Sequence, residues 1–119
     1  MSSKNSAQRL RDIIDNIDAI RAFTADMNLG DFAGDRKTVY AVTRALEIIS
    51  EASRRLPDDL KLRHPGIDWT AIAAAGNVYR HEYEVVDEAL VWYTAQNSLT
   101  ELQDASIAEV RRLTAAGPE

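Results

Sequence analysis

The chain has 119 residues, of which 14 are basic and 19 acidic, and its net charge is −5. This length fits one compact domain, which we expect to cover residues 1–119 with a core from about residue 7 to residue 113. The absence of cysteine excludes disulfides, thiolate metal sites and a cysteine nucleophile. The negative charge argues against a protein that coats nucleic acid, but it is compatible with a small basic cleft.

The start of the chain lacks the apolar core of a signal peptide, and no apolar run has the length of a membrane span. These features predict a soluble, cytoplasmic protein with no membrane partner. Residues 1–6 are expected to be frayed.

The first predicted helix runs from Ala7 to about Met27. Apolar residues recur along it at helical spacing and charges occupy the opposite side; the apolar set is Leu10, Ile13, Ile14, Ile17, Ile20 and Phe23. The segment 28–30 is expected to end this helix because Gly30 tolerates a positive φ. Residues 31–34 are then a short link.

Asp35 is placed to cap a second helix, and Pro57 is placed to end it. Its apolar stripe comprises Val39, Val42, Ala45, Leu46, Ile49, Ala52 and Leu56. Asp58 is expected to cap a short extra helical turn near residues 58–63, which Pro65 and Gly66 break.

Asp68 is predicted to cap a third helix that runs from Trp69 into the region of His81, and Asp87 a fourth. The fourth is long and is expected to bend or break near residues 104–106. Trp69 and Trp92 are expected to anchor the core. Because no strand pattern is present, the sequence predicts an all-α, single-domain bundle of four main helices in up-down order.

Reactive groups concentrate between residues 76 and 87. His81 is a residue type that can gain or lose a proton near neutral pH, Arg80 is a fixed cation beside it, and Tyr83 adds a phenol two residues on. Such a set suits acid–base chemistry on a phosphate, and it equally suits the polar end of a helix.

Other candidate sites are weaker. Glu47 and Glu51 lie one helical turn apart, which fits half of a carboxylate metal site or, more simply, pairing of Glu51 with Arg55. His64 precedes Pro65 in an expected surface turn and receives no role. Because the glycine-rich phosphate loops and the histidine spacings of zinc and di-iron sites are absent, we expect no metal or cofactor.

The chain resembles the HepT-like proteins of the HEPN superfamily, the toxin half of two-gene systems with a minimal nucleotidyltransferase. The resemblance covers residues 10–102 and rests on an ordered set of segments: Asp35-Arg-Lys-Thr38, Arg44-Ala-Leu-Glu-Ile-Ile-Ser-Glu-Ala52, Asp68-Trp69, Asn77-Val-Tyr-Arg-His-Glu-Tyr83, Asp87 and Trp92.

This resemblance implies a HEPN-like fold and metal-independent endoribonuclease cleavage of RNA by a homodimer. The family motif is an arginine, four to six residues, a histidine, any residue and a tyrosine; His81 and Tyr83 match its last two positions. The histidine would move a proton of the ribose 2′-hydroxyl or the leaving oxygen, and the arginine would hold the phosphate. Asn77 belongs to the same substrate-binding segment. The partner nucleotidyltransferase antitoxin would adenylylate Tyr83.

The sequence departs from the family at one position. The family arginine usually stands immediately before the asparagine that matches Asn77, and Gly76 occupies this position here. Arg80 lies four residues later on the same helical face, and one turn of about 5.4 Å is within its reach. We therefore expect Arg80 to take the phosphate-binding role, unless it pairs with Glu84.

Three hypotheses follow from the sequence. The first is a ribonuclease toxin that uses Arg80. The second is an inactive HEPN dimer that only binds nucleotide or its partner, because the arginine is replaced by Gly76. The third is a plain structural helical-bundle subunit.

Overall fold

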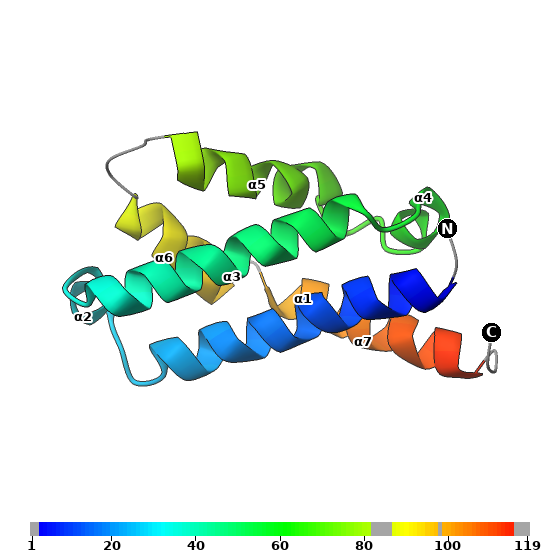
Figure 1. Cartoon of the computed structure of the whole chain (residues 1–119), viewed down its shortest axis with the longest axis horizontal. Helices are drawn as coiled ribbons and strands as arrows, with labels where there is room; N and C mark the ends of the chain where they lie inside the picture. Colours follow the sequence, from blue (N-terminus) through cyan, green and yellow to red (C-terminus); the bar gives the residue numbers. More distant parts are fainter. Residues whose placement is uncertain (1–2, 82–86, 98, 116–119) are drawn as a thin grey trace.

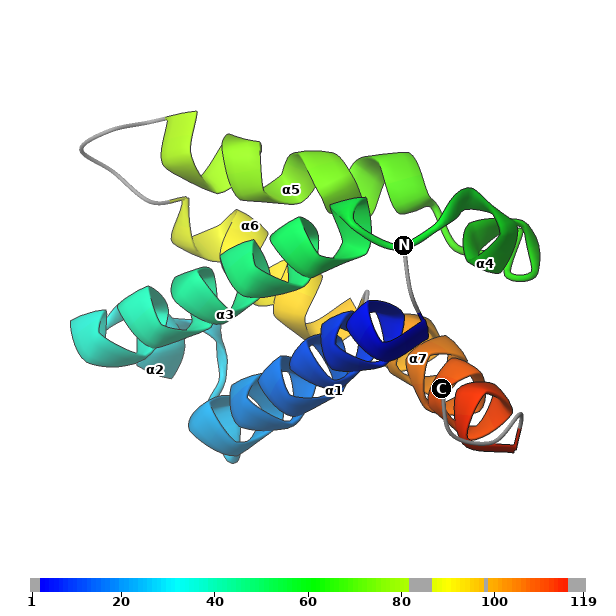
Figure 2. The ribbon, with the colours of Figure 1, turned by 45° about the vertical axis from the view of Figure 1, so that its right-hand side comes forward.

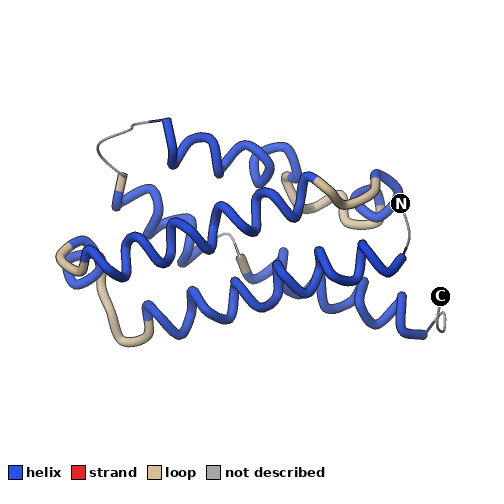
Figure 3. The backbone as a smooth tube through the Cα atoms, in the orientation of Figure 1, coloured by secondary structure: helices blue, strands red, loops and turns tan. Residues whose placement is uncertain are grey.

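The computed structural model describes residues 3–81, 87–97 and 99–115, and for residues 3, 4 and 76–81 it describes the backbone alone. This part of the chain forms seven α-helices and no strand (Figures 1 and 3). In chain order they are α1 (Ser3–Thr24), α2 (Leu29–Ala33), α3 (Arg36–Arg54), α4 (Asp58–Leu62), α5 (Trp69–His81), α6 (Glu88–Asn97) and α7 (Thr100–Ala115). The all-α prediction is confirmed.

The long helices run in alternating directions along the chain: α1 and α5 run one way, and α3 and α7 run the other way (Figures 1 and 2). This is the up-down order that the sequence predicts. α3 lies at the centre, with α1 packed on one side and α5 on the other. α7 packs along α1, whereas α6 packs on α2 and α3. α4 lies at the end of the bundle where α1 begins and α7 ends. None of the described helices combines the length and the apolar character that crossing a membrane needs.

One hydrophobic cluster joins these helices. Its fully buried side chains include Leu10, Ile13, Ile17, Ile20, Phe32, Val42, Val91 and Leu102. Trp69 and Trp92 pack against this cluster, and Trp92 lies at a tilted angle to Phe32 with ring centroids 5.3 Å apart. Burial of apolar area is the main favourable term in folding, so this cluster holds the bundle together. The prediction of two tryptophan anchors is confirmed.

The first two helices differ from the prediction at their junction. α1 begins at Ser3 and ends at Thr24, and Asp26 adopts a positive φ of 63° in the turn that follows. Asn28 was expected within a helix stop, but it caps α2 instead. Its side chain accepts a hydrogen bond from the Asp31 amide, and the Asp31 carboxylate accepts one from the Asn28 amide. This reciprocal capping box makes a helix out of the expected link.

Of the two N-cap residues predicted for α3 and α4, the first is confirmed and the second is wrong. Asp35 caps α3 as predicted, because its carboxylate accepts bonds from both the amide and the hydroxyl of Thr38. α4 starts at Asp58, but Pro57 occupies the capping position and makes no side-chain cap. Asp58 therefore lies inside the first turn, where its charge still favours the positive end of the helix dipole.

The break in the last predicted helix falls earlier than expected. α6 ends at Asn97 and α7 starts at Thr100, while residues 104–106 are continuous helix. The two helices contact different partners. The Arg21 guanidinium in α1 donates to Gln103 and, at 3.1 Å, to the Thr100 hydroxyl, and Gln103 donates to Asp18 at 2.8 Å. One straight helix cannot follow α3 and then α1, so the chain turns before Thr100.

A buried carboxylate fastens the connection between α4 and α5 to α7. Glu109, whose side chain is only 5% exposed, accepts two bonds from Arg63 at 2.7 and 3.1 Å and one from His64 at 2.7 Å. The hydrogen bonds from Arg63, and after them the one from His64, hold the pKa of Glu109 below its usual 4.5, although burial opposes the shift. His64 is thus a structural partner, which the sequence prediction missed.

We predict that Glu109→Gln lowers the free energy of unfolding by about 1.5–3 kcal/mol at neutral pH, the range for hydrogen bonds to a charged group. Because the folded-state pKa of Glu109 is depressed, its contribution is present above about pH 4.5 and is lost as the pH falls through the folded pKa. Chemical denaturation across this pH range tests the prediction.

Asp104→Asn, at an exposed position of the same helix, serves as the control. It should change stability little at any pH. A Glu109→Gln deficit that persists unchanged at the acid end of the range would contradict the role assigned to the carboxylate.

Candidate active site

The helix that carries the sequence motif begins at a well-defined cap. The Asp68 carboxylate accepts a hydrogen bond from the Ala71 amide at 3.0 Å, as predicted. Trp69, the first residue of α5, donates its indole N–H to the His64 carbonyl at 3.1 Å. The cap and the indole together fix where α5 starts.

A buried hydroxyl of α3 bonds to the backbone of α5. Ser50 donates to the carbonyl of Ala73 at 2.8 Å, and Ser50 itself is 1% exposed. The two helices run antiparallel (Figure 2). Ile72 and Ala75 pack against the core, whereas Ala71 and Ala74 are exposed. α5 therefore has a clear inner and outer side through its first two turns.

The predicted site residues fall in the last turns of this helix. Gly76, Asn77, Arg80 and His81 all belong to α5. Arg80 follows Gly76 by four residues, so the two positions share one face. Position 81 follows position 74 by seven residues, so these two positions share one face of the helix.

The roles of these residues stay predictions, because the side chains of residues 76–81 are outside what the structure describes. Tyr83 and Glu84 lie outside the described residues, so the Arg80–Glu84 alternative is untested as well. Beyond them, Asp87 caps α6 as predicted, accepting from the Leu90 amide at 3.0 Å.

The Ser50–Ala73 hydrogen bond sets the register of α5 on α3 and shows which α3 residues are level with the end of α5. Seven residues forward from Ala73 is Arg80, and seven residues back from Ser50 is Thr43. Because both helices rise about 1.5 Å per residue, these positions are level. Thr43 is buried and its hydroxyl has no hydrogen-bond partner among the described residues. Neighbouring Arg44 is 71% exposed.

The first half of α3 carries cations and an aromatic ring. Arg36 donates two hydrogen bonds to the Tyr40 hydroxyl at 2.8 and 3.0 Å, and its guanidinium carbon lies 5.2 Å from the ring centroid. Tyr40 is 53% exposed. Arg44 approaches Glu47 only at 3.6 Å, so its donors remain open to solvent. Arg36 and Arg44 belong to sequence segments that resemble the family, whereas no sequence signal marks Tyr40.

Glu51 is occupied by arginines, as the simpler sequence interpretation predicts. Its carboxylate accepts from Arg54 at 2.6 Å and from Arg55 at 2.9 Å. The Glu47–Glu51 pair is therefore not a free pair of carboxylates, and we assign it no metal.

Comparison with known proteins identifies the class of this helical bundle. The family described as "Ribonuclease HepT-like" matches residues 13–108, from the middle of α1 to the middle of α7. The chain belongs to this family, and the expected HEPN-like resemblance is confirmed.

Individual relatives agree with this assignment. The chain is 40% identical over 94 residues to the "Probable ribonuclease HepT" of Thermococcus cleftensis, covering 79% of this chain and 86% of that protein. It is 30% identical over 103 residues to a "Putative RNase" of Methanocaldococcus jannaschii, covering 87% and 94%. A second such protein of that organism is 35% identical over 94 residues, covering 79% and 81%. No solved structure gave a significant match.

We predict that Ser50→Ala loosens α5 specifically, because it removes the bond that positions the motif helix. The free energy of unfolding should fall by about 1 kcal/mol, a typical value for one hydrogen bond. Amide hydrogen exchange in α5 should accelerate more than in α1 or α7.

Ser53→Ala is the matched control, since Ser53 is equally buried but donates to Ser50 within α3 at 2.7 Å. It should cost similar stability without selective loss of protection in α5. Equal exchange profiles for the two variants would contradict the positioning role of Ser50.

Proposed function

We propose that this protein is a HepT-like toxin, an endoribonuclease that cleaves RNA without a metal ion in a homodimer cleft. Membership of the Ribonuclease HepT-like family is the observation that carries the proposal. The names of the relatives support a nuclease, and the adjacent places of Arg80 and His81 at the end of α5 are compatible with a shared site.

The reaction we propose is internal transfer at phosphorus. The ribose 2′-oxygen attacks the adjacent phosphorus and loses its proton, while the bond from phosphorus to the 5′-oxygen breaks and that oxygen gains a proton. His81 would act as the base or the acid in these transfers, since histidine titrates near neutral pH. In a homodimer, the second His81 would be available for the other transfer.

Arg80 would stabilise the phosphate as charge builds on its oxygens. A guanidinium forms two parallel hydrogen bonds with a phosphate, and it remains charged at all relevant pH values. The exposed Arg44 is level with the last turn of α5, and the Arg36–Tyr40 pair, one to two turns nearer the start of α3, adds further cationic and aromatic surface. These described residues support binding of a phosphate backbone at this end of the bundle, despite the net charge of −5.

The remaining parts of the proposal concern partners. We propose that a nucleotidyltransferase antitoxin neutralises the protein by adenylylating Tyr83, two residues after His81. Asn77 would contact the substrate from the preceding turn of α5. The cytoplasm, where RNA and such a partner are available, is the compartment that this function requires.

The second candidate function is an inactive dimer that binds nucleotide or its partner. Gly76 favours it, because the family arginine usually occupies this position and the helical register merely places Arg80 on the same face.

The first test concerns His81. Purified protein should fragment single-stranded RNA in the presence of a chelator, and His81→Ala should reduce the rate about 10²–10⁴-fold, the usual contribution of acid–base catalysis. Circular dichroism should show the variant folded. Because both proteins are purified identically, equal fragmentation by the two would identify a contaminating nuclease and reject the role of His81.

The second test concerns the arginine. Arg80→Ala should reduce kcat about 10²–10³-fold, as removal of one transition-state donor does, and Arg80→Lys should recover part of the activity. Arg112→Ala, at an exposed position of α7, should leave cleavage unchanged. An inactive wild type that gains activity from Gly76→Arg alone would instead support the inactive-dimer function.

A further inference from the structure

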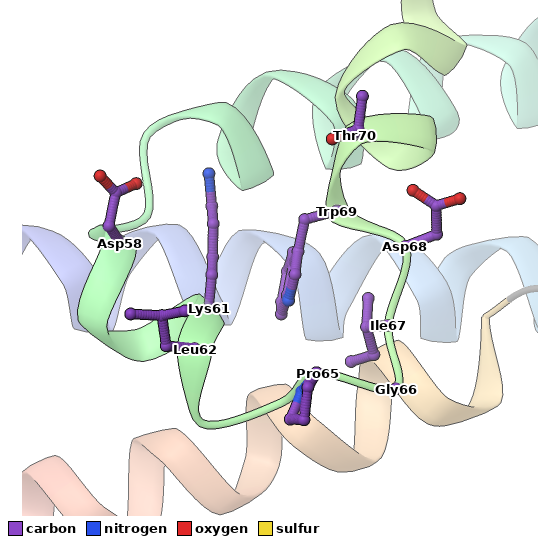
Figure 4. A pocket seen from close by; sticks show the side chains of 9 residues that line it. All are labelled: Asp58, Lys61, Leu62, Pro65, Gly66, Ile67, Asp68, Trp69 and Thr70. Atoms are coloured by element: carbon purple, nitrogen blue, oxygen red, sulfur yellow. The ribbon is translucent and has the colours of Figure 1, made fainter.

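A cavity of about 730 Å³ lies between α4 and the first turn of α5, at the opposite end of α5 from His81 (Figure 4). The Trp69 ring projects into it, and the stem of Lys61 extends beside the ring. Pro65 closes it below. Asp58 and Asp68 stand on its two sides, so its rim carries two carboxylates and one ammonium group.

The aromatic wall of this cavity is held in place. The indole N–H of Trp69 bonds to the His64 carbonyl at 3.1 Å, and the ring packs in part against the core. The His64 side chain is in turn fixed by Glu109 at 2.7 Å. The ring therefore presents a fixed surface, which lowers the entropy that a stacking ligand must lose.

The polar groups around the ring are largely uncommitted. Neither the Lys61 ammonium nor the Asp58 carboxylate bonds to any side chain in the described ranges. Asp68 uses only one oxygen, for the Ala71 amide. The cavity thus offers an ammonium donor, two carboxylate acceptors, the hydroxyl of Thr70 and an aromatic surface together.

This combination selects the kind of ligand. Two carboxylates against one ammonium disfavour a phosphate or another anion. A flat, uncharged ring with both donors and acceptors on its edge fits, and a nucleobase is such a ring. Base stacking on aromatic side chains is also how proteins hold single-stranded RNA.

We propose that this cavity binds one nucleobase of the RNA substrate, stacked on Trp69, with Lys61 donating to its acceptor atoms and the carboxylates accepting from its amino or imino groups. The proposal rests on the proposed function as a ribonuclease. It adds a second point of contact between the enzyme and its substrate.

The distance between the two points sets a length for the substrate. Trp69 and His81 are separated by 12 residues of helix, or about 18 Å at 1.5 Å per residue. At a rise of 3.4 Å per nucleotide, a helical strand covers this in about five nucleotides. A trinucleotide bound at His81 should not reach the cavity.

The direct test is a titration of the full chain carrying His81→Ala, so that nothing is cleaved, with adenosine and cytidine. Either nucleoside should shift the Trp69 indole N–H signal in the nuclear magnetic resonance spectrum, saturably and more than that of Trp92. Ribose 5-phosphate, which lacks a base, should not. No saturable shift with either nucleoside, or an equal one with ribose 5-phosphate, would overturn the proposal.

Further substitutions in the His81→Ala background test the Trp69 and Lys61 contacts one at a time, through their effect on RNA binding. Trp69→Leu should weaken binding of a labelled single-stranded RNA about 5- to 150-fold, the equivalent of one stacked base. Lys61→Met, which removes an ammonium that has no side-chain partner among the described residues, should weaken it about two- to tenfold. Arg11→Met, which removes a cation from an exposed position of α1, should leave it unchanged. Equal effects of Lys61→Met and Arg11→Met would overturn the proposal.

A cleavage assay distinguishes this proposal from the proposed function. With His81 intact, Lys61→Met should raise KM for a long RNA and leave KM for a trinucleotide unchanged. A KM increase for both substrates would overturn the second contact point. If wild type cleaves neither substrate, the proposed function fails, and the nucleoside titration still decides whether the cavity binds a base.

Discussion

The burial of α3 between two layers is the constraint on which the rest of the structure depends. Ten of its 19 residues are buried, and they face α1 on one side and α5 and α6 on the other. Val42, Leu46 and Ile49 are among the buried apolar side chains, each at most 4% exposed. Truncating one such side chain to alanine typically costs about 2–5 kcal/mol, which is comparable to the stability of a small domain. Packing of α5 against the buried α3, and not the motif itself, therefore sets the orientation of the motif helix.

Polar contacts complete what apolar packing leaves undetermined. Ser50 fixes the level of α5 on α3, and Gln103 fixes α7 on α1. Glu109 fixes the connection between α4 and α5, which has little apolar surface of its own to bury. Because a buried polar group is stable only when its hydrogen-bond partners are in place, each of these contacts also specifies one arrangement against its alternatives.

Much of the fold could be predicted from the sequence. The apolar stripes of residues 10–23 and 39–56 indicate two helices without ambiguity, and Asp35, Asp68 and Asp87 mark three helix starts that the structure confirms. The capping box of Asn28 was missed because Gly30, one residue inside α2, suggested a helix end. The break before Thr100 was misplaced because it depends on which neighbours α6 and α7 contact.

The candidate site was predictable only as a set of residues along one helix. Spacing alone places Arg80 four residues after Gly76, and the structure confirms that helix. The spacing does not reveal which residues of α3 lie beside this helix. Thr43 and Arg44 come level with Arg80 only through the register that the Ser50–Ala73 hydrogen bond sets. The link between His64 and Glu109 was equally hidden, because 45 residues separate them and no local pattern marks the pair.

The loops that these contacts close differ greatly in length. The Ser50–Ala73 bond joins residues 23 apart, whereas the bonds between α1 and α7 join residues 79 to 89 apart. Loop-closure entropy makes the longer closure only about 1 kcal/mol costlier, but a chain emerging from the ribosome meets the two contacts at different times. All residues of the α3–α5 pair are present once position 81 has been synthesised. More than twenty further residues must be synthesised before α7 can pack on α1. During synthesis, the motif helix thus gains its scaffold before the bundle is closed.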